Sequence, residues 1–213
     1  MQPDKAVKAD ISARYYTDNA DLLSVKYERV TFEEIHPDLV RVLDDRTGNA
    51  LDIGAGSGRD AAWLSKHGWS VTAVEPSMAL LCRAKRRHSD VQIRWVRDSL
   101  PNLSAIHPIA GPFDLILLSA VWMHIDPKQE TIAISRLKRL LSHSGLLSLS
   151  IKTGDVDENR GFFAIDLDAL VVNFKSGGFS LMNQTRDTQQ RGIEWRRLLL
   201  RKTSPTIGRI ATD

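Results

Sequence analysis

Residues 51–60 read LDIGAGSGRD, with three glycines between two acidic residues. Ala50–Ile53 is a short apolar strand, and a helix is expected from Arg59 to His67, ending at Gly68. Glycines between a strand and a helix let the backbone turn tightly and let a ligand approach main-chain N–H groups. The stretch therefore predicts a ligand-binding turn between the first strand and the first core helix of an α/β domain.

Strands and helices alternate through the residues that follow this turn. Strands are expected at 71–74, 91–96, 113–119 and 146–151, and helices at 78–88, from 126 onward and at 166–175. In the helix at 78–88, Met78, Leu81 and Ala84 are expected to face inward. This alternation predicts a mostly parallel, doubly wound sheet, in which ligands lie beyond the carboxyl ends of the strands.

The two ends of the chain complete the expected fold. Helices at Ile11–Ser24 and Pro37–Leu43 precede the first strand. Phe179–Thr185 and Ile193–Arg201 are predicted to pair as a hairpin, so one strand runs antiparallel. The fold class is therefore α/β, with a doubly wound, mostly parallel seven-stranded sheet, an antiparallel C-terminal hairpin strand, helices on both faces and a helical N-terminal cap.

The composition agrees with one globular domain. The chain has 213 residues, of which 42% are hydrophobic and 26% charged, which excludes a disordered chain and a disulfide-knit module. We expect a cap over residues 1–45, a Rossmann-like core over 46–202 and a tail over 203–213. The formal net charge of +3 does not by itself predict nucleic-acid binding.

The sequence also bears on location and assembly. Cys82 is the only cysteine, so no intrachain disulfide forms. The N-terminus lacks the apolar region of a signal peptide, and the apolar runs are too short to cross a membrane. The expectation is a cytoplasmic monomer or homodimer that does not bind a membrane.

An acidic residue follows the second strand, at a position that matters for nucleotide ligands. Glu75 comes 21 residues after Gly54, and a carboxylate there accepts hydrogen bonds from ribose hydroxyls. The third glycine, Gly58, comes one position too early for the dinucleotide fingerprint G-x-G-x-x-G. Asp52, just before the turn, would repel a pyrophosphate but suits a ligand with an ammonium or sulfonium group. The spacing therefore argues against a nicotinamide dinucleotide.

At this point the sequence resembles the class I S-adenosylmethionine-dependent methyltransferases. Their motifs are matched by the acid and glycines at 52–58, by Val74-Glu75-Pro76, by Arg97-Asp98-Ser99 and by the strand at 113–118. The resemblance extends from about Tyr15 to Lys202 and is greatest to small stand-alone members. It implies that S-adenosylmethionine is the cofactor and S-adenosylhomocysteine the product.

The resemblance also assigns residues to the cofactor. Glu75 would hold the ribose, Asp98 the adenine amino group, and Asp52 with the glycine backbone the methionine moiety. Tyr15 or Tyr16 would close over the cofactor, although ordinary helix packing is an equal alternative for both. The full set of expected cofactor-binding residues is Asp52, Gly54, Ala55, Gly56, Gly58, Glu75, Pro76, Asp98, Ser99, Ser119, Tyr15 and Tyr16.

The catalytic and acceptor-binding residues are expected after the fourth and fifth strands. His124 is the candidate general base, because its ordinary pKa lies near the working pH. Trp122 is a candidate wall of the acceptor pocket, and Lys152 and Arg160 are candidate contacts to an acidic substrate. Each has a structural alternative: a histidine packed at a loop edge, a core tryptophan, or a solvated charged loop. No metal is expected.

The acceptor is less well specified than the cofactor. The leading hypothesis is a small-molecule methyl acceptor, with an RNA- or protein-directed methyltransferase as the alternative and a non-catalytic S-adenosylmethionine-binding subunit as a third reading. Amino-adenine and glutamine methylation are disfavoured because no proline follows Ser119, and cytosine C5 methylation because Cys82 lies in a helix. An NAD(P)-dependent reductase is disfavoured because Tyr-x-x-x-Lys is absent. The acceptor atom stays open.

Overall fold

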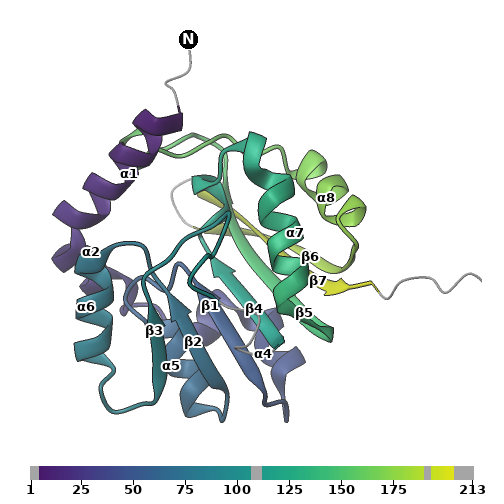
Figure 1. Cartoon of the computed structure of the whole chain (residues 1–213), viewed down its shortest axis with the longest axis horizontal. Helices are drawn as coiled ribbons and strands as arrows, with labels where there is room; N and C mark the ends of the chain where they lie inside the picture. Colours follow the sequence, from purple (N-terminus) through teal and green to yellow (C-terminus); the bar gives the residue numbers. More distant parts are fainter. Residues whose placement is uncertain (1–4, 107–111, 190–192, 204–213) are drawn as a thin grey trace, which may run out of the picture.

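The strands form one sheet, shown in Figure 1. The computed structural model describes residues 5–106, 112–189 and 193–203. Within them the sheet has the order β3-β2-β1-β4-β5-β7-β6. Its strands are β1 Asn49–Ile53, β2 Ser70–Val74, β3 Ile93–Val96, β4 Phe113–Ser119, β5 Leu141–Thr153, β6 Phe179–Gln189 and β7 Ile193–Lys202.

The strand directions agree with the expected fold class. β1, β2, β3, β4 and β5 pair in parallel, whereas β7 pairs antiparallel with both β5 and β6. The parallel neighbours are joined by crossovers, so the carboxyl ends of β1, β2, β4 and β5 meet at one edge of the sheet. This confirms the doubly wound sheet with a C-terminal hairpin.

Helices surround the sheet and precede it. The helices before β1 are α1 Lys5–Asp18, α2 Ala20–Tyr27, α3 Phe32–Ile35 and α4 Pro37–Leu43. Those that follow are α5 Arg59–Lys66, α6 Met78–Arg87, α7 Glu130–Leu140 and α8 Leu167–Ser176. Short 3₁₀ turns among the described residues lie in the loops: η2 Trp122–His124, η3 Pro127–Gln129 and η4 Glu158–Arg160.

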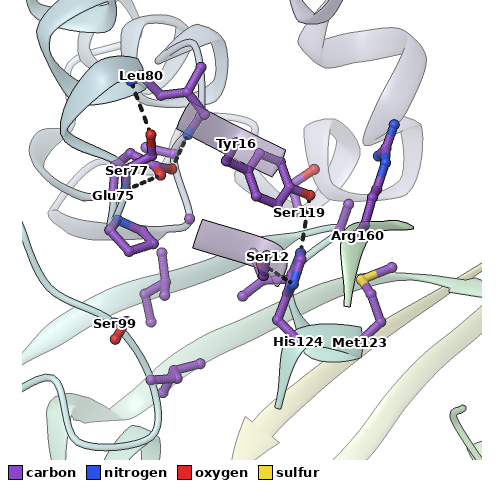
Figure 2. A pocket seen from close by; sticks show the side chains of 18 of the residues that line it. Ser12, Tyr16, Glu75, Ser77, Leu80, Ser99, Ser119, Met123, His124 and Arg160 are labelled. Carbon is purple, nitrogen blue, oxygen red and sulfur yellow. Dashed lines mark hydrogen bonds between the residues drawn. The ribbon is translucent and has the colours of Figure 1, made fainter. Parts of the chain in front are cut away.

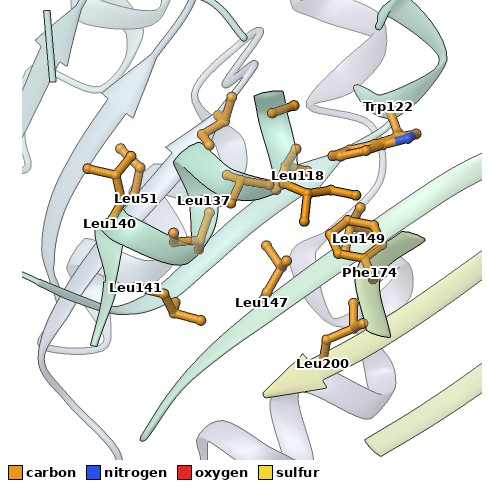
Figure 3. Packing of buried hydrophobic residues seen from close by; sticks show 14 of the residues in the cluster. Leu51, Leu118, Trp122, Leu137, Leu140, Leu141, Leu147, Leu149, Phe174 and Leu200 are labelled. Carbon is orange, nitrogen blue, oxygen red and sulfur yellow. The ribbon is translucent and has the colours of Figure 1, made fainter. Parts of the chain in front are cut away.

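The sheet separates two hydrophobic clusters. Leu115 and Leu117 of β4 pack with α3, α4 and α5, whereas Ile116 and Leu118 pack with α7 and α8. Side chains of a strand alternate between its two faces, so both faces of β4 are covered and the near-continuous apolar run is explained. Figure 3 shows the second cluster, where Phe174 of α8 lies beside the strands.

Several element boundaries differ from the sequence-based expectation. The first helix begins at Lys5 and is interrupted at Asn19, whose side-chain amide donates to the Tyr15 carbonyl oxygen at 2.9 Å. Pro127 opens a 3₁₀ turn rather than the α-helix itself, which starts at Glu130. The expectation that Met78 faces inward is wrong: it is the first residue of α6 and 47% exposed, because Leu80 takes the inward position.

Candidate active site

The turn after β1 is held against β2 by its backbone. The amides of Gly54 and Ala55 donate to the Val74 carbonyl oxygen at 2.8 and 2.9 Å. Gly54 has a φ of +71°, and a Cβ there would collide with the side chain of Val121, which follows β4. A side chain at this position is therefore excluded both by conformation and by space. The strand ends of β1, β2 and β4 meet at the turn.

Glu75, at the end of β2, is fixed by two backbone donors. Its Oε2 accepts from the Gly56 amide at 2.9 Å, and its Oε1 accepts from the Ser77 amide at 2.8 Å. The side chain is 5% exposed, and burial raises the pKa of this carboxyl to about 7, against the lowering effect of the two hydrogen bonds. The carboxylate lines the cavity with unused lone pairs that can accept from a ligand's hydroxyl groups.

Asp52 lies behind the glycine turn, outside the set of residues that line the cavity. It is 1% exposed, and its Oδ2 has no hydrogen-bond partner among the described atoms. Burial, with the nearby charges of Asp60 and Glu75, raises the pKa of this carboxyl well above its usual value, whereas Arg59 lowers it. An unpaired buried carboxylate oxygen favours a positively charged ligand in the neighbouring turn.

An ion-pair cluster that the sequence analysis missed lies at the start of α5. Asp60 accepts from Arg59 Nε at 2.6 Å and pairs with His36 Nε2 at 3.1 Å. His36 and Arg59 hold the pKa of the Asp60 carboxyl well below its usual range, in spite of its burial. The cluster joins the N-terminal cap to the glycine turn. Asp60 is the last residue of the quoted stretch 51–60, but only the fold brings His36 to it.

Asp98 and Ser99 follow β3 and line the cavity, as does Pro76. Asp98 Oδ1 accepts from the Ser99 amide at 2.8 Å, and its Oδ2 accepts from the Ala105 amide at 2.6 Å. The carboxylate therefore organises its own loop. Each oxygen retains a second lone pair, so the loop role and a contact to a ligand amino group are compatible.

His124, in η2 after β4, is held between two hydroxyl groups of α1. Its Nε2 lies 3.1 Å from the Tyr16 hydroxyl, and its Nδ1 lies 3.2 Å from Ser12 Oγ (Figure 2). Burial, assisted by the charge of Arg160, lowers the pKa of His124 to about 4. The imidazole is therefore neutral near pH 7, with one ring nitrogen available to accept a proton.

The two tyrosines of α1 have different positions. Tyr16 lines the cavity, and Tyr15 is not among the lining residues. Tyr15 packs edge-on against Tyr16, with ring centroids 5.4 Å apart, and the Arg160 guanidinium lies 5.0 Å from the centroid of the Tyr15 ring. Tyr15 therefore supports Tyr16 from behind.

Of the three residues expected to contact the acceptor, the structure places two at the cavity and one in the core. Lys152, at the end of β5, and Arg160, in η4, line the cavity. Arg160 Nε lies 3.2 Å from Asp157 Oδ2. Trp122 does not form a wall of the pocket: it is 0% exposed, packs on Phe174 at 5.0 Å between ring centroids and belongs to the core. The 3₁₀ turn points Trp122 to the core side and leaves His124 on the cavity side.

One cavity of about 1170 Å³ connects these groups. Of the cofactor-binding residues expected from the sequence, those that line it are Gly54, Ala55, Gly56, Glu75, Pro76, Asp98, Ser99, Ser119 and Tyr16. Asp52, Gly58 and Tyr15 lie outside the lining set. The cavity also receives side chains that the sequence analysis missed: Lys8, Ser12, Tyr27, Phe162, Phe163 and Trp195.

The missed residues on α1 carry a signal that was present in the sequence. Lys8, Ser12 and Tyr16 are four residues apart, so they share one face of a helix. The expected helix started at Ile11, which left Lys8 outside it. Among residues 5–106, 112–189 and 193–203, the structure contains no group of three His, Cys, Asp or Glu side chains arranged to hold a metal ion.

The strand order and the glycine turn together define the class I methyltransferase fold. The crystal structure of Burkholderia thailandensis 1,6-didemethyltoxoflavin-N1-methyltransferase, with bound 1,6-didemethyltoxoflavin and S-adenosylhomocysteine, superposes with a TM-score of 0.76. It is 20% identical in sequence, over 96% of this chain and 92% of that chain. At this identity the likeness concerns the fold.

Sequence comparison points to the same family. Residues 50–145 match the family described as "Methyltransferase domain". An uncharacterized methyltransferase from Mycobacterium bovis is 35% identical over 99 residues, which is 46% of this chain and 48% of that protein. Ribosomal RNA small subunit methyltransferase J from Shewanella baltica is 30% identical over 142 residues, 59% of this chain and 57% of that protein. The chain is thus similar to methyltransferases in sequence and in fold, and its alignments span about half of these curated relatives.

The residues around the turn fit an S-adenosylmethionine molecule. The glycine turn leaves room for a ligand at the main chain, Glu75 offers carboxylate lone pairs, and Asp52 has an unpaired buried oxygen. These are an acceptor for ribose hydroxyls and a buried carboxyl group behind the turn, whose charged form a nearby cation would favour. In the part of the chain that the structure describes, no helix is long and apolar enough to span a membrane.

Proposed function

We propose that this protein transfers a methyl group from S-adenosylmethionine to a small-molecule acceptor. One observation carries the proposal: a single cavity joins the glycine turn and Glu75 to His124 beneath helix α1. A cofactor bound at the turn and an acceptor bound near His124 would share that space. Because α1 covers the cavity, the acceptor is expected to be small enough to be enclosed. A cytoplasmic location is a separate prediction.

The cofactor assignments follow from the positions of the acids and amides. Glu75 would accept from the ribose hydroxyls, and Asp98 would accept from the adenine amino group, with Ser99 and Pro76 beside the ring. S-adenosylmethionine, when bound, supplies a methyl group activated by its sulfonium centre. Asp52 would favour that positive charge from behind the turn, because its buried oxygen has no other partner. The chain then supplies position and electrostatics.

His124 is the proposed proton acceptor for an acceptor that must lose a proton. Both ring nitrogens contact hydroxyl groups, so a proton from the acceptor would reach the imidazole by way of the Tyr16 or Ser12 hydroxyl. The acceptor's proton would pass to the hydroxyl oxygen as that hydroxyl gives its own proton to the bare nitrogen. Because its pKa is about 4, His124 is unprotonated at neutral pH and is a weak base. This suits a transient acceptor of a proton during transfer.

An RNA- or protein-directed methyltransferase is the alternative, and the similarity to the Shewanella baltica ribosomal RNA methyltransferase supports it. A polymer would need an open route to His124, which α1 covers through Ser12 and Tyr16. A non-catalytic S-adenosylmethionine-binding subunit is the third reading. It predicts cofactor binding without turnover for any acceptor.

Calorimetric titration of the purified protein tests the proposal. S-adenosylmethionine and S-adenosylhomocysteine are expected to bind with micromolar dissociation constants, whereas NADH and NADPH should not bind. Radiolabelled S-adenosylmethionine then reports methyl transfer to small molecules, to total RNA and to protein in parallel. Binding of nicotinamide dinucleotides in place of the adenosyl ligands would contradict the cofactor assignment, and transfer to RNA or protein alone would contradict the acceptor class.

A further inference from the structure

One face of α1 carries three polar side chains into the cavity. Lys8, Ser12 and Tyr16 follow a four-residue spacing, and all three line the cavity. Ser12 and Tyr16 are the two groups that contact His124. Lys8 is the third member of the row, and neither the cofactor nor the proton transfer uses it.

Lys8 is a buried ammonium group that has no anionic partner among the residues that the structure describes. The residue is 7% exposed, and its Nζ donates to the Phe162 carbonyl oxygen at 2.6 Å. Its Nζ also lies 4.5 Å from the centroid of the Phe163 ring. No carboxylate of the described residues forms an ion pair with it. Buried charges in proteins are normally paired, and two of the three ammonium hydrogens remain for a ligand.

A second unpaired cation lies on the sheet side of the same cavity. Lys152 is half-buried at the end of β5, and within the described residues it has no hydrogen bond or ion pair. Trp195 is its cross-strand partner in β7, so the two side chains project from the same face of the sheet. Arg160 also lines the cavity, but its charge is offset by Asp157. Two uncompensated ammonium groups and aromatic walls therefore line this cavity.

The position of Lys8 separates it from the cofactor's own carboxylate. Tyr16 lies near the glycine turn: its neighbour Tyr27 has a ring carbon 3.4 Å from the point where a Gly56 Cβ would stand. Lys8 is eight residues earlier on α1, about 12 Å along the helix axis. Its contacts are with Phe162 and Phe163, in the loop after β5. That loop also reaches His124, whose ring centroid lies 4.7 Å from that of Phe162, so it lies at the end of the cavity proposed for the acceptor.

We propose that the methyl acceptor is a flat molecule bearing an oxyanion, a carboxylate or a phosphate monoester, which Lys8 and Lys152 bind. Phe163 and Trp195 supply aromatic surface for its ring. This inference rests on the proposed methyltransferase function and specifies the substrate class of that same site. The anion is held at one end of the acceptor, which places the nucleophilic group of the acceptor toward His124.

Binding measured on the protein saturated with S-adenosylhomocysteine tests the inference. The probes are 4-hydroxybenzoate, 3,4-dihydroxybenzoate and indole-3-carboxylate, each with its neutral amide, and phenyl phosphate with phenol. At least one anion is expected to bind ten times more tightly than its neutral partner in calorimetry or ligand-detected NMR. The carboxylate and phosphate arms show which oxyanion is preferred.

Variants separate this inference from the proposed function. Lys8→Met and Lys152→Met are each expected to abolish the preference for the anion and to leave affinity for S-adenosylhomocysteine within twofold of the wild type. Lys8→Arg should retain the preference, and Lys175→Met, an exposed control on α8, should change nothing.

Three outcomes would overturn the inference. They are equal binding of anions and neutral partners, no binding of any anion to the cofactor-loaded protein, and a Lys8→Met variant that loses affinity for S-adenosylhomocysteine. The last would assign Lys8 to the cofactor. If Lys8→Met does not fold, Lys152→Met alone decides. Failure of the wild type to bind S-adenosylhomocysteine would instead contradict the proposed function.

Discussion

At the scale of single residues, the site depends on acids and a histidine whose protonation is set by burial. Glu75 and His124 show opposite effects of the same cause, because burial disfavours the charged form of each group. The pKa of the Glu75 carboxyl rises to about 7, and that of the His124 imidazole falls to about 4. Near pH 7 the His124 imidazole is therefore uncharged, whereas the Glu75 carboxyl in the same cavity is close to its pKa.

Glu75 is expected to couple cofactor binding to pH. The ligand-free protein holds a proton on Glu75 below about pH 7, whereas ribose hydroxyls are bound best by the carboxylate. Lowering the pH from 8 to 6 should therefore weaken S-adenosylhomocysteine binding about tenfold. Calorimetry at pH 6, 7 and 8 measures this slope. Glu75→Gln should bind weakly at each pH, without the slope, and a wild-type affinity independent of pH would refute the assignment.

Tyr16 is expected to affect turnover more than cofactor binding. Tyr16→Phe removes the hydroxyl 3.1 Å from His124 Nε2 and retains the ring. Once an acceptor is known, kcat should fall by about 100-fold or more, since a positioned proton-transfer group typically contributes about 10²–10⁴-fold. Tyr15→Phe is the matched control, because Tyr15 has no contact with His124. Equal kcat values for the two variants would exclude Tyr16 as the relay and leave Ser12 as the remaining route.

At the scale of elements, helix α1 and the loop after β5 decide how the cavity is covered. The α1 backbone packs directly on η4, and a Cβ at Gly161 would collide with the Lys8 carbonyl oxygen. Gly161 has a φ of +67°, so both its conformation and its contact exclude a side chain. The amide of Phe163 then donates to the Met123 carbonyl oxygen at 2.8 Å, which ties this loop to η2.

Gly161→Ala is expected to displace α1 from the cavity. The added methyl group would push the helix off the loop, which should separate Ser12 and Tyr16 from His124. Turnover should fall by at least tenfold, and proteolysis within residues 5–18 should become faster. Gly154→Ala is the matched control: it carries a similar φ of +91°, but nothing lies within 4 Å of its Cβ position. If both variants lose activity equally, backbone strain rather than the α1 contact is responsible.

The elements also show the limits of sequence periodicity. The strands at 71–74 and 113–119 were predicted almost to the residue, because apolar runs buried on both faces give a strong signal. β5 begins at Leu141, five residues before the expected strand, because its first residues are polar and its pairing with β4 shifts register between Phe113 and Leu115. The α1 boundary was missed because a helix covering a cavity is polar on its inner face.

At the scale of the whole molecule, one 3₁₀ turn beyond β4 contributes to both the hydrophobic core and the site. Trp122 and His124 belong to the same 3₁₀ turn, yet one side chain enters the cluster around Phe174 and the other lines the cavity. Trp122 Nε1 also donates to Glu130 Oε1 at 3.1 Å. The turn therefore depends on the core for its orientation, and through it the position of His124 depends on the packing of α7 and α8.

Trp122 is expected to affect stability and not the choice of acceptor. Trp122→Ala should lower the free energy of unfolding by about 3–5 kcal/mol, as for other large-to-small core substitutions. Urea denaturation followed by circular dichroism measures the change. Trp122→Phe, which loses the Glu130 hydrogen bond but retains a ring, should have a smaller effect. Wild-type stability of Trp122→Ala would show that the side chain does not support the core.

The sequence alone determined the fold class, the position of the glycine turn and the acids after β2 and β3. These are local signals: apolar runs of strand length, glycines where a strand meets a helix, and carboxylates at fixed spacing from them. The order of these motifs along the chain is also what makes the sequence resemble the methyltransferases. Glu75 could be placed at the site because parallel strands bring their carboxyl ends to one edge.

Only the tertiary structure decided which side chains share the cavity. Lys8 and Phe163 are separated by more than 150 residues, and the polar face of α1 meets its partners only when the chain folds, in η2 after β4 and in the loop after β5. The tertiary structure likewise assigned Trp122 to the core and His124 to the site, two residues apart in one turn. Periodicity reports which faces are apolar, whereas burial, pKa and cavity contacts arise from segments that meet only on folding.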